Sequence, residues 1–578
     1  MKTMKKTYKL LTIAMLSLQG IAQTQFWNSV NYKGAFPVTD GLSTVASNDW
    51  TKGWANWDPE ITVYPAGTTT ISANITTNTT WTSGNTYVLV GNIAVTPGNT
   101  LTIQPGTVIR GDKTSKACLI ITAGAKINAV GTATNPIVFT SNETTRANGD
   151  WGGVVLCGYG IINTACPTCT AAARTNYVEG FALNFPEILY GGTNNADNSG
   201  TMSYCRIEFA GVALSATPNS ELNSLTMGGV GSGTTLDHIQ CSFGGDDSFE
   251  WFGGAVDAKY LIAFRGIDDD FDTDFGYIGR VQFGLSVRDK DKYDIIAGAE
   301  SNGFESDNFN PGLGRTPITK AIFSNMTMIG PKRDGTASLP GSQTFKNAIY
   351  TRRNTAISVH NSIIVGWPQG WHLKDGITFD NYNANSNLDS MGVIKNTIIT
   401  TDVTTRFVFN SGGANSAWYD AYAGANSIDT TKTVAQVAFV NAFPTNLYDN
   451  SDFRLSASST ASTGASFAGP QFAGQIITST VSIGVNELSQ VLGNSFNVYP
   501  NPASDNANVT FTLLANNKVS ITVYDILGKV VTNLSQENNF EKGNNVVKLN
   551  TSELSSGIYF VAISVNNAKE VSKLIISK

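Results

Sequence analysis

The sequence is short of charged residues, and it contains only three histidines. Charged side chains make up 14% of the chain, and the formal net charge is −6. A nucleic-acid-binding surface needs a stripe of basic residues, so this composition argues against a nucleic-acid partner. The histidines at 238, 360 and 372 are scattered, and no neighbouring residues indicate a Ser-His-Asp triad. No glycine-rich loop follows a strand-like run and opens a helix, so nucleotide binding is not expected.

The sequence has one short apolar run near its N-terminus and no long apolar run after it. Four lysines precede an apolar stretch over residues 10–18, and the small residues Gly20 and Ala22 come just before Gln23. This order is typical of a signal peptide over residues 1–22. No later run is long enough to span a membrane, so we expect a mature chain without a transmembrane segment. The first cysteine is Cys118, so no lipid-anchoring cysteine follows the apolar stretch.

Cysteine is scarce as well, with six in the chain. An even number in an exported protein is compatible with disulfides. Cys157, Cys166 and Cys169 fall in or beside a polar stretch over residues 160–175, which is typical of an inserted loop, and we expect a local disulfide among them. The Cys166–Cys169 spacing also occurs in zinc and redox sites, but no second pair or nearby histidine accompanies it. The other three, at 118, 205 and 241, lie in apolar runs and are expected in the core.

Composition divides the rest of the chain into four parts. Residues 23–60 are rich in tryptophan, which indicates either a carbohydrate platform or, as we favour, a cap over the open end of an elongated core. Residues 61–455 contain short strand-like runs divided by Gly and Asn. Residues 456–490 are rich in Ser, Ala, Thr and Gly and predict a linker. Residues 491–578 read as a small all-β unit.

A repeat lies within the second part. Residues 239–250 align with residues 261–272 at an offset of 22, which pairs Asp246 with Asp268 and Phe249 with Phe271. A further 22 residues brings Tyr293 under Phe271. This period fits one coil of a parallel β-helix, in which coils stack about 4.8 Å apart. We therefore expect an inward aromatic stack of these three rings.

The runs at residues 106–111, 125–140, 244–253 and 302–307 resemble right-handed parallel β-helix proteins of bacterial surfaces. The resemblance covers about two thirds of the chain. It implies an all-β fold, with a right-handed parallel β-helix followed by a small C-terminal β-sandwich. Many members of this group have no established activity, so the resemblance supports the fold more than a function.

The last 85 or so residues resemble the type A sorting domains of Bacteroidetes type IX secretion. The resemblance rests on a Tyr-Pro-Asn-Pro opening, a turn, a Ser-Gly-Ile-Tyr strand and a basic last strand. It implies an immunoglobulin-like sandwich that docks on the type IX translocon and is removed by a surface sortase. The cargo would then be secreted or attached to the outer-membrane surface. The motif residues are Tyr499, Pro500, Asn501, Pro502, Asp525, Gly528, Lys529, Gly557, Tyr559, Lys573 and Lys578.

Carboxylates concentrate at the repeat. Side chains alternate between the faces of a strand, so if Phe271 points inward its even-numbered acidic neighbours point outward. Stacking then places Asp268 beside Asp246 and Asp272 beside Glu250. Such pairs repel, and protons, neighbouring bases or a bound cation must offset the repulsion. Because oxygen ligands favour Ca²⁺, the predicted calcium ligands are Asp246, Glu250, Asp268, Asp270, Asp272 and Asp274.

A solvated acidic face is the alternative to a metal site. Its counter-charges would be Lys259, Arg265, Arg280, Arg288, Lys290 and Lys292.

Three functions fit these features. The one we favour is a non-enzymatic surface protein that binds glycans or mediates adhesion, with Ca²⁺ as a cofactor in the acidic residues. Some β-helix proteins are polysaccharide lyases or glycoside hydrolases, which is the second reading. A lyase would use Arg265 as base, and a hydrolase would use paired carboxylates, Asp246 with Asp247 or Asp268 with Asp269. The third reading is a purely structural surface-layer component.

Overall fold

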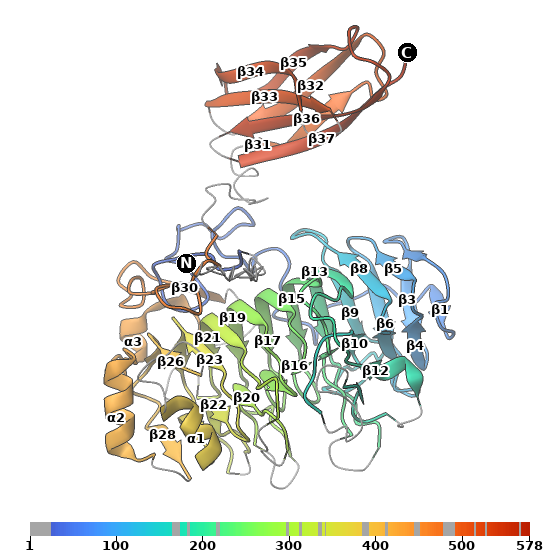
Figure 1. Cartoon of the computed structure of the whole chain (residues 1–578). Helices are drawn as coiled ribbons and strands as arrows, with labels where there is room; N and C mark the ends of the chain where they lie inside the picture. Colours follow the sequence, from blue (N-terminus) through green and yellow to red (C-terminus); the bar gives the residue numbers. More distant parts are fainter. Residues whose placement is uncertain are drawn as a thin grey trace, which may run out of the picture.

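The protein is described from a computed structural model (Figure 1). The predicted signal peptide, residues 1–22, lies outside the described residues. Among the described residues, no helix combines the length and apolar character needed to cross a membrane. The described ranges are 25–164, 174–181, 185–215, 220–295, 300–310, 315–332, 338–341, 343–383, 392–410, 414–443, 451–477, 492–513, 516–525, 529–565 and 568–578.

Two long parallel sheets form the main body. Strands that follow one another in the chain alternate between the sheets over most of their length, so each coil adds a strand to both. The 16-stranded sheet contains β1 (Thr69–Ile71), β2 (Thr79–Trp81), β3 (Thr86–Leu89), β5 (Thr100–Ile103), β6 (Val108–Gly111), β8 (Lys126–Val130), β9 (Ile137–Ser141), β13 (Gly200–Glu208), β15 (Thr235–Ser242), β17 (Asp257–Phe264), β19 (Arg280–Val287), β21 (Ile322–Ile329), β23 (Ser358–His360), β24 (Ile363–Val365), β26 (Ile394–Lys395) and β27 (Ile398–Ile399).

The second sheet positions the candidate site. Its strand order is β28-β25-β22-β20-β18-β16-β14-β10-β7-β4, and its pairings are parallel. This arrangement confirms the predicted parallel β-helix. The strands are β4 (Asn92–Val95), β7 (Cys118–Ile121), β10 (Val154–Cys157), β14 (Leu225–Gly228), β16 (Phe249–Phe252), β18 (Phe271–Asp274), β20 (Phe304–Ser306), β22 (Asn347–Thr351), β25 (Gln369–Leu373) and β28 (Thr405–Phe409).

The inward aromatic stack is present, but its third member differs from the prediction. The Phe249 and Phe271 rings lie 5.6 Å apart at an angle of 7°. The next ring is Phe304, 5.4 Å from Phe271. Tyr293 instead packs against Phe345. The chain between β19 and β20 is longer than the 22-residue repeat allows, so Tyr293 falls in this longer connection.

The sequence analysis predicts that the tryptophan-rich segment caps the open end of the core, but the segment packs elsewhere. Trp54 and Phe36 are buried against outward side chains of the larger sheet, including Phe264 and Leu285. Backbone contacts follow the same path, since the Asn28 N–H donates to Gln282 Oε1 at 2.9 Å. The segment therefore covers a lateral face. It packs there because those outward positions are aromatic or aliphatic.

The C-terminal end of the core is covered instead by the short helices α1 (Gly376–Asn383) and α2 (Ser416–Ala425), which the sequence analysis did not predict. A further helix, α3 (Val434–Val437), packs Val437 against Ile363 and Ile398 of the larger sheet. Tyr382 and Tyr422 lie 4.9 and 5.3 Å from the ring of Trp371 in the last coils. Because the aromatic residues of α1 and α2 pack on the last coil, these helices shield the end of the core from water.

Much of the predicted linker is part of the body. After β29 (Phe439–Asn441) and β30 (Asp452–Leu455), which pair antiparallel, residues 456–477 run back along the β-helix. Phe467 and Phe472 pack against Phe26 and Trp27, and Trp27 bridges Ile476. We call residues 451–477 the C-terminal strap. The rest of the predicted linker lies outside the described residues.

Four cysteines are buried free thiols: Cys118, Cys157, Cys205 and Cys241. The expectation of core residues is therefore confirmed for the first, third and fourth of these. Cys157 ends the core strand β10 as a free thiol, so it is not part of the local disulfide expected among Cys157, Cys166 and Cys169. Cys166 and Cys169 lie outside the described residues. The segment after β10 also contains β11 (Asn176–Tyr177), η2 (Pro186–Ile188) and β12 (Leu189–Tyr190).

The C-terminal unit is the predicted β-sandwich, built from two antiparallel sheets. Val509, Phe511, Ile521, Val561 and Ile563 belong to its own core. One sheet has the order β31-β32-β35 and the other β34-β33-β36-β37. The strands are β31 (Leu492–Tyr499), β32 (Asn506–Leu513), β33 (Asn517–Asp525), β34 (Val530–Phe540), β35 (Gly543–Asn550), β36 (Gly557–Val565) and β37 (Ala568–Ile576).

Candidate functional site

The acidic residues lie along two rows on the second sheet. The register aligns Leu225, Phe249, Phe271, Phe304 and Ile349 of successive coils. Two residues before each of these positions lies what we call the corner row: Asn223, Asp247, Asp269, Asn302 and Asn347. One residue after them lies the outer row: Thr226, Glu250, Asp272, Glu305 and Tyr350.

The corner row is a ladder of side-chain to backbone hydrogen bonds. The Asp247 N–H donates to Asn223 Oδ1 at 3.2 Å, and the Asp269 N–H donates to Asp247 Oδ1 at 2.8 Å. The Asn302 N–H donates to Asp269 Oδ1 at 2.5 Å, and the Asn347 N–H donates to Asn302 Oδ1 at 3.1 Å. Any Asn or Asp can accept in this way. Aspartate at two positions, 247 and 269, therefore adds negative charge without changing these hydrogen bonds to the backbone.

The outer row is stabilised at its two ends and not in its middle. Asn223 Nδ2 donates to Glu250, and Arg352 donates to Glu305. Asn302 Nδ2 also donates to Glu305, at 3.2 Å. Between them, Oδ1 of Asp272 is buried and has no hydrogen-bond partner. Such an oxygen needs a proton or a cation, because burial without a partner is costly.

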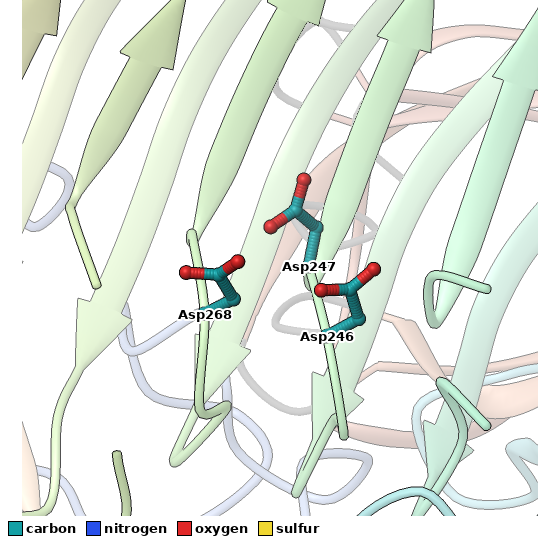
Figure 2. A group of neighbouring side chains, drawn as sticks. All are labelled: Asp246, Asp247 and Asp268. Atoms are coloured by element: carbon teal, nitrogen blue, oxygen red, sulfur yellow. The ribbon is translucent and has the colours of Figure 1, made fainter. Parts of the chain in front are cut away.

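The two rows, together with Asp246 and Asp268 in the bends just before the corner row, form three adjoining carboxylate groups. Within each group, one oxygen from every member lies within 4.8 Å of the others. Figure 2 shows the first, in which Asp246 and Asp268 lie on neighbouring coils beside Asp247. Asp247 also belongs to the second group, and Asp272 joins the second to the third. We call the set the acidic ladder. Its groups are Asp246–Asp247–Asp268, Asp247–Glu250–Asp272 and Asp269–Asp272–Glu305.

The structure brings four of the six predicted calcium ligands into the ladder and leaves two outside it. Asp270 does not point outward as expected: it is fully buried and bonds Arg288 Nε at 3.0 Å. Since β18 begins at Phe271, Asp270 lies in the bend before the strand, where alternation does not hold. Asp274 lies at the other end of β18, where it accepts the Phe275 N–H at 2.6 Å.

Arg265, the predicted lyase base, is engaged outside the three groups. Its Nε donates to Asp289 Oδ2 at 2.8 Å, and its Nη1 lies 3.3 Å from Glu60 Oε2. Its guanidinium also lies over the Phe243 ring, 4.8 Å from the centroid. Two carboxylates favour the charged guanidinium. This arrangement counts against Arg265 as a base, which would have to be neutral.

Of the other predicted counter-charges, Arg288 lies beside the carboxylates, where it pairs with Asp270 and donates to the Asp268 carbonyl, and the rest bind elsewhere. Arg280 pairs with Asp257, Lys290 with Asp291, and Lys292 with Glu60. Lys259 Nζ donates to Asn28 Oδ1 at 2.5 Å. The ladder is buried or half-buried, so it is not the solvated acidic face of the alternative reading.

Several residues of the site were missed. Glu305 follows Asp272 at a longer step than the repeat, so the period does not reveal it. Arg352 and Arg353, which pair with Asp307, carry no spacing signal. Glu179 comes from the segment between β10 and β13, and only the folded chain brings it to Glu250 and Asn223.

Burial and mutual repulsion raise the pKa values throughout the ladder. Burial, with the charges of Glu305 and Asp294, raises the pKa of Asp268 to about 8. Burial, with the charge of Glu221, raises the pKa of Glu179 to about 7. Burial followed by neighbouring carboxylates likewise raises the pKa values of Asp247, Glu250 and Asp272 well above the ordinary range. The ladder at neutral pH therefore takes up either protons or cations.

The predicted sorting residues tie the strand ends of the C-terminal sandwich together. Asn501 Nδ2 donates to the Lys573 carbonyl at 2.6 Å. The Lys529 N–H donates to Asp525 Oδ1 at 3.0 Å and links the end of β33 to the start of β34. Tyr559 Oη donates to the Ser555 carbonyl at 3.1 Å. Gly528 lies outside the described residues.

Comparison with known families agrees with both parts of the fold. Residues 73–438 match the family described as the pectate-lyase like beta helix domain, which covers more than half of the chain. Residues 497–577 match the secretion system C-terminal sorting domain, which confirms that part of the prediction. No curated protein matches the chain.

Proposed function

The chain belongs to the family of pectate-lyase-like β-helix domains, and we propose that it is a non-enzymatic, calcium-stabilised surface protein that binds polysaccharide. Its sorting domain directs export by the type IX secretion system, to the cell surface or the outside of the cell. The export is established by the family match. The calcium and the polysaccharide are our proposal.

The main support for calcium is the unpartnered carboxylate oxygen of Asp272 in the middle of the outer row. Asp272 Oδ1 is buried without a donor, and Asp272 shares one carboxylate group with Glu250 and another with Glu305. A proton would satisfy one oxygen of one such group, whereas a cation between the coils would satisfy several. Oxygen-only donors suit Ca²⁺. Asp247, Glu250 and Asp272 would hold the ion, and its charge would offset their repulsion.

A neutral oxygen next to the ladder supports the same view. Thr226 pairs in register with Glu250, so both side chains lie on the same face of the sheet. Thr226 is fully buried, and its Oγ1 has no hydrogen-bond partner. Calcium sites commonly combine carboxylates with neutral oxygens.

The same sheet suggests where an acidic polysaccharide would bind. Beyond the ladder, strands β22, β25 and β28 carry or adjoin basic side chains, among them Arg353, Lys374 and Arg406. Lys374 and Arg406 are exposed, and Arg353 is one-third exposed at its side chain. Cations spaced along parallel strands suit a repetitive anionic chain.

The test is to incubate the mature chain with a panel of acidic and neutral polysaccharides, with Ca²⁺ or with a chelator. Pull-down, new reducing ends and unsaturated-uronate absorbance are measured together. We expect retention on acidic polymers without product, and weaker retention after Lys374→Glu. Product on any polymer would make the protein an enzyme. Neither binding nor product would leave a structural surface component.

A further inference from the structure

The two sheets of the sorting domain have outer faces of different character. In the four-stranded sheet, Val561 and Ile563 of β36 point into the core. Alternation then turns Ile558 and Phe560 outward, where they are 41% and 36% exposed. Val571 of β37 is 52% exposed. Large apolar side chains on a solvent-facing sheet are unusual when they adjoin one another.

The strand register joins these residues into one patch. Ile558 pairs with Ile575, and Phe560 pairs with Tyr524 on its other side. Tyr524 in turn pairs with Val530 of β34, which is 47% exposed. We call this patch the apolar outer face. Its residues are Tyr524, Val530, Ile558, Phe560, Val571 and Ile575.

The opposite outer face is more polar. On the three-stranded sheet, Asn508 pairs with Lys548 and Thr512 pairs with Asn544. Thr510 pairs with Val546, whose apolar side chain is exposed but has polar neighbours. Tyr499, which pairs with Asn508, is also exposed on this sheet. Val546 and Tyr499 do not pair with each other, whereas the apolar residues of the four-stranded sheet adjoin one another in register. The continuous apolar patch thus lies on one side of the sandwich.

Three of the residues that mark the sorting family, Asp525, Lys529 and Lys573, adjoin the apolar outer face. Asp525 directly follows Tyr524 and Lys529 directly precedes Val530, and the Lys529 N–H donates to Asp525 Oδ1. Lys573 is exposed and pairs with Phe560. The core cluster of this domain contains no described residue of the β-helix, so the β-helix does not share it.

We propose that the apolar outer face is the surface by which a protein component of the type IX secretion machinery recognises this chain. A sorting domain acts by being recognised, and this face combines apolar area with the family's marker residues. The partner surface would be apolar at its centre and carry a carboxylate or carbonyl opposite Lys573. Buried aromatic anchors such as Phe560 usually dominate such contacts.

The experiment uses the full chain expressed in a cell with type IX secretion. The double variant Ile558→Thr, Phe560→Ser is compared with Val546→Thr, a matched change on the polar outer face. The measurement is the fraction of chain that reaches the surface or medium. We expect export of the double variant to fall about tenfold or more, as when a central anchor is lost, and export of Val546→Thr to stay at the wild-type level.

A folding defect would mimic this loss, so Lys573→Glu is measured beside it. Lys573 is exposed, and the change reverses its charge without touching the core. Protease resistance of the retained pool reports the fold. Reduced export of folded Lys573→Glu supports the proposal. Wild-type export of both face variants would overturn it, as would an equal loss in Val546→Thr.

Discussion

Asp247 and Asp269 occupy positions that asparagine fills in neighbouring coils. Asn223 and Asn302 of the same row donate their amides to Glu250 and Glu305. An aspartate in that place offers another acceptor where the asparagine offers a donor. The excess negative charge is therefore not needed for the ladder of backbone bonds, which supports a role in holding a cation.

Replacing one of these aspartates tests that argument. In chelator, Asp247→Asn should raise the free energy of unfolding by on the order of 1 kcal/mol. The amide is neutral without the cost of protonating a crowded carboxyl group, and its Oδ1 still accepts the Asp269 N–H. In Ca²⁺, the same variant should gain less from the metal than the wild type. Thermal unfolding with and without chelator measures both effects. Asp291→Asn, at an exposed side chain, is the control, and a lowered midpoint of Asp247→Asn in chelator would count against the account.

The raised pKa values predict how stability depends on pH. A carboxyl group whose pKa is higher in the folded chain stabilises the fold at low pH, and this contribution is lost as pH rises through the folded value. For Asp268 this pH window runs from about 4, the value in the unfolded chain, to about 8. For Glu179 it runs from about 4 to about 7. The midpoint in chelator should therefore fall between pH 5 and 8. Ca²⁺ should reduce this fall, and a midpoint that rises across the window would contradict the account.

At the level of elements, the C-terminal strap belongs to the folded body. The Phe26 N–H donates to the Gln475 carbonyl at 2.7 Å, and the Ala465 N–H donates to the Asn31 carbonyl at 3.0 Å. The start and the end of the described cargo are thus held together. The folded cargo therefore extends beyond residue 455, the boundary that the composition indicates.

A chain that ends at residue 455 should accordingly be less stable than one that ends at residue 477. Loss of residues 456–477 of the C-terminal strap would expose Trp27, which is fully buried, and remove the packing of Phe467 and Phe472. Thermal unfolding and tryptophan fluorescence of the two chains measure the difference. Equal midpoints would mean that the strap contributes little.

The sequence predicted the regular coils better than the longer connections, the bends and the segments that pack on the coils. The 22-residue offset correctly pairs Phe249 with Phe271, because both strands are one repeat apart. It fails for Tyr293, because a longer connection delays the next strand to Phe304. Local alternation likewise fails for Asp270, which lies outside the strand. Composition misjudged the tryptophan-rich segment and the strap, because their partners are distant in the chain.

For the whole molecule, the fold and the export route followed from the sequence, whereas the site followed only in part. Periodicity and the family motifs reflect local regularity, which a sequence displays directly. The pairing of Arg352 with Glu305 and the approach of Glu179 to Glu250 depend on stacking of distant segments. The function of the exported body thus depends on contacts that the sequence does not display.

The most direct test of the account is a calorimetric titration of the mature chain with Ca²⁺, beside Asp272→Asn and the control Asp291→Asn. The wild type and the control should bind Ca²⁺, and Asp272→Asn should bind at least about tenfold more weakly, because it removes the charge that two carboxylate groups share. No binding by the wild type, or equal binding by Asp272→Asn, would contradict the proposal that the acidic ladder is a calcium site.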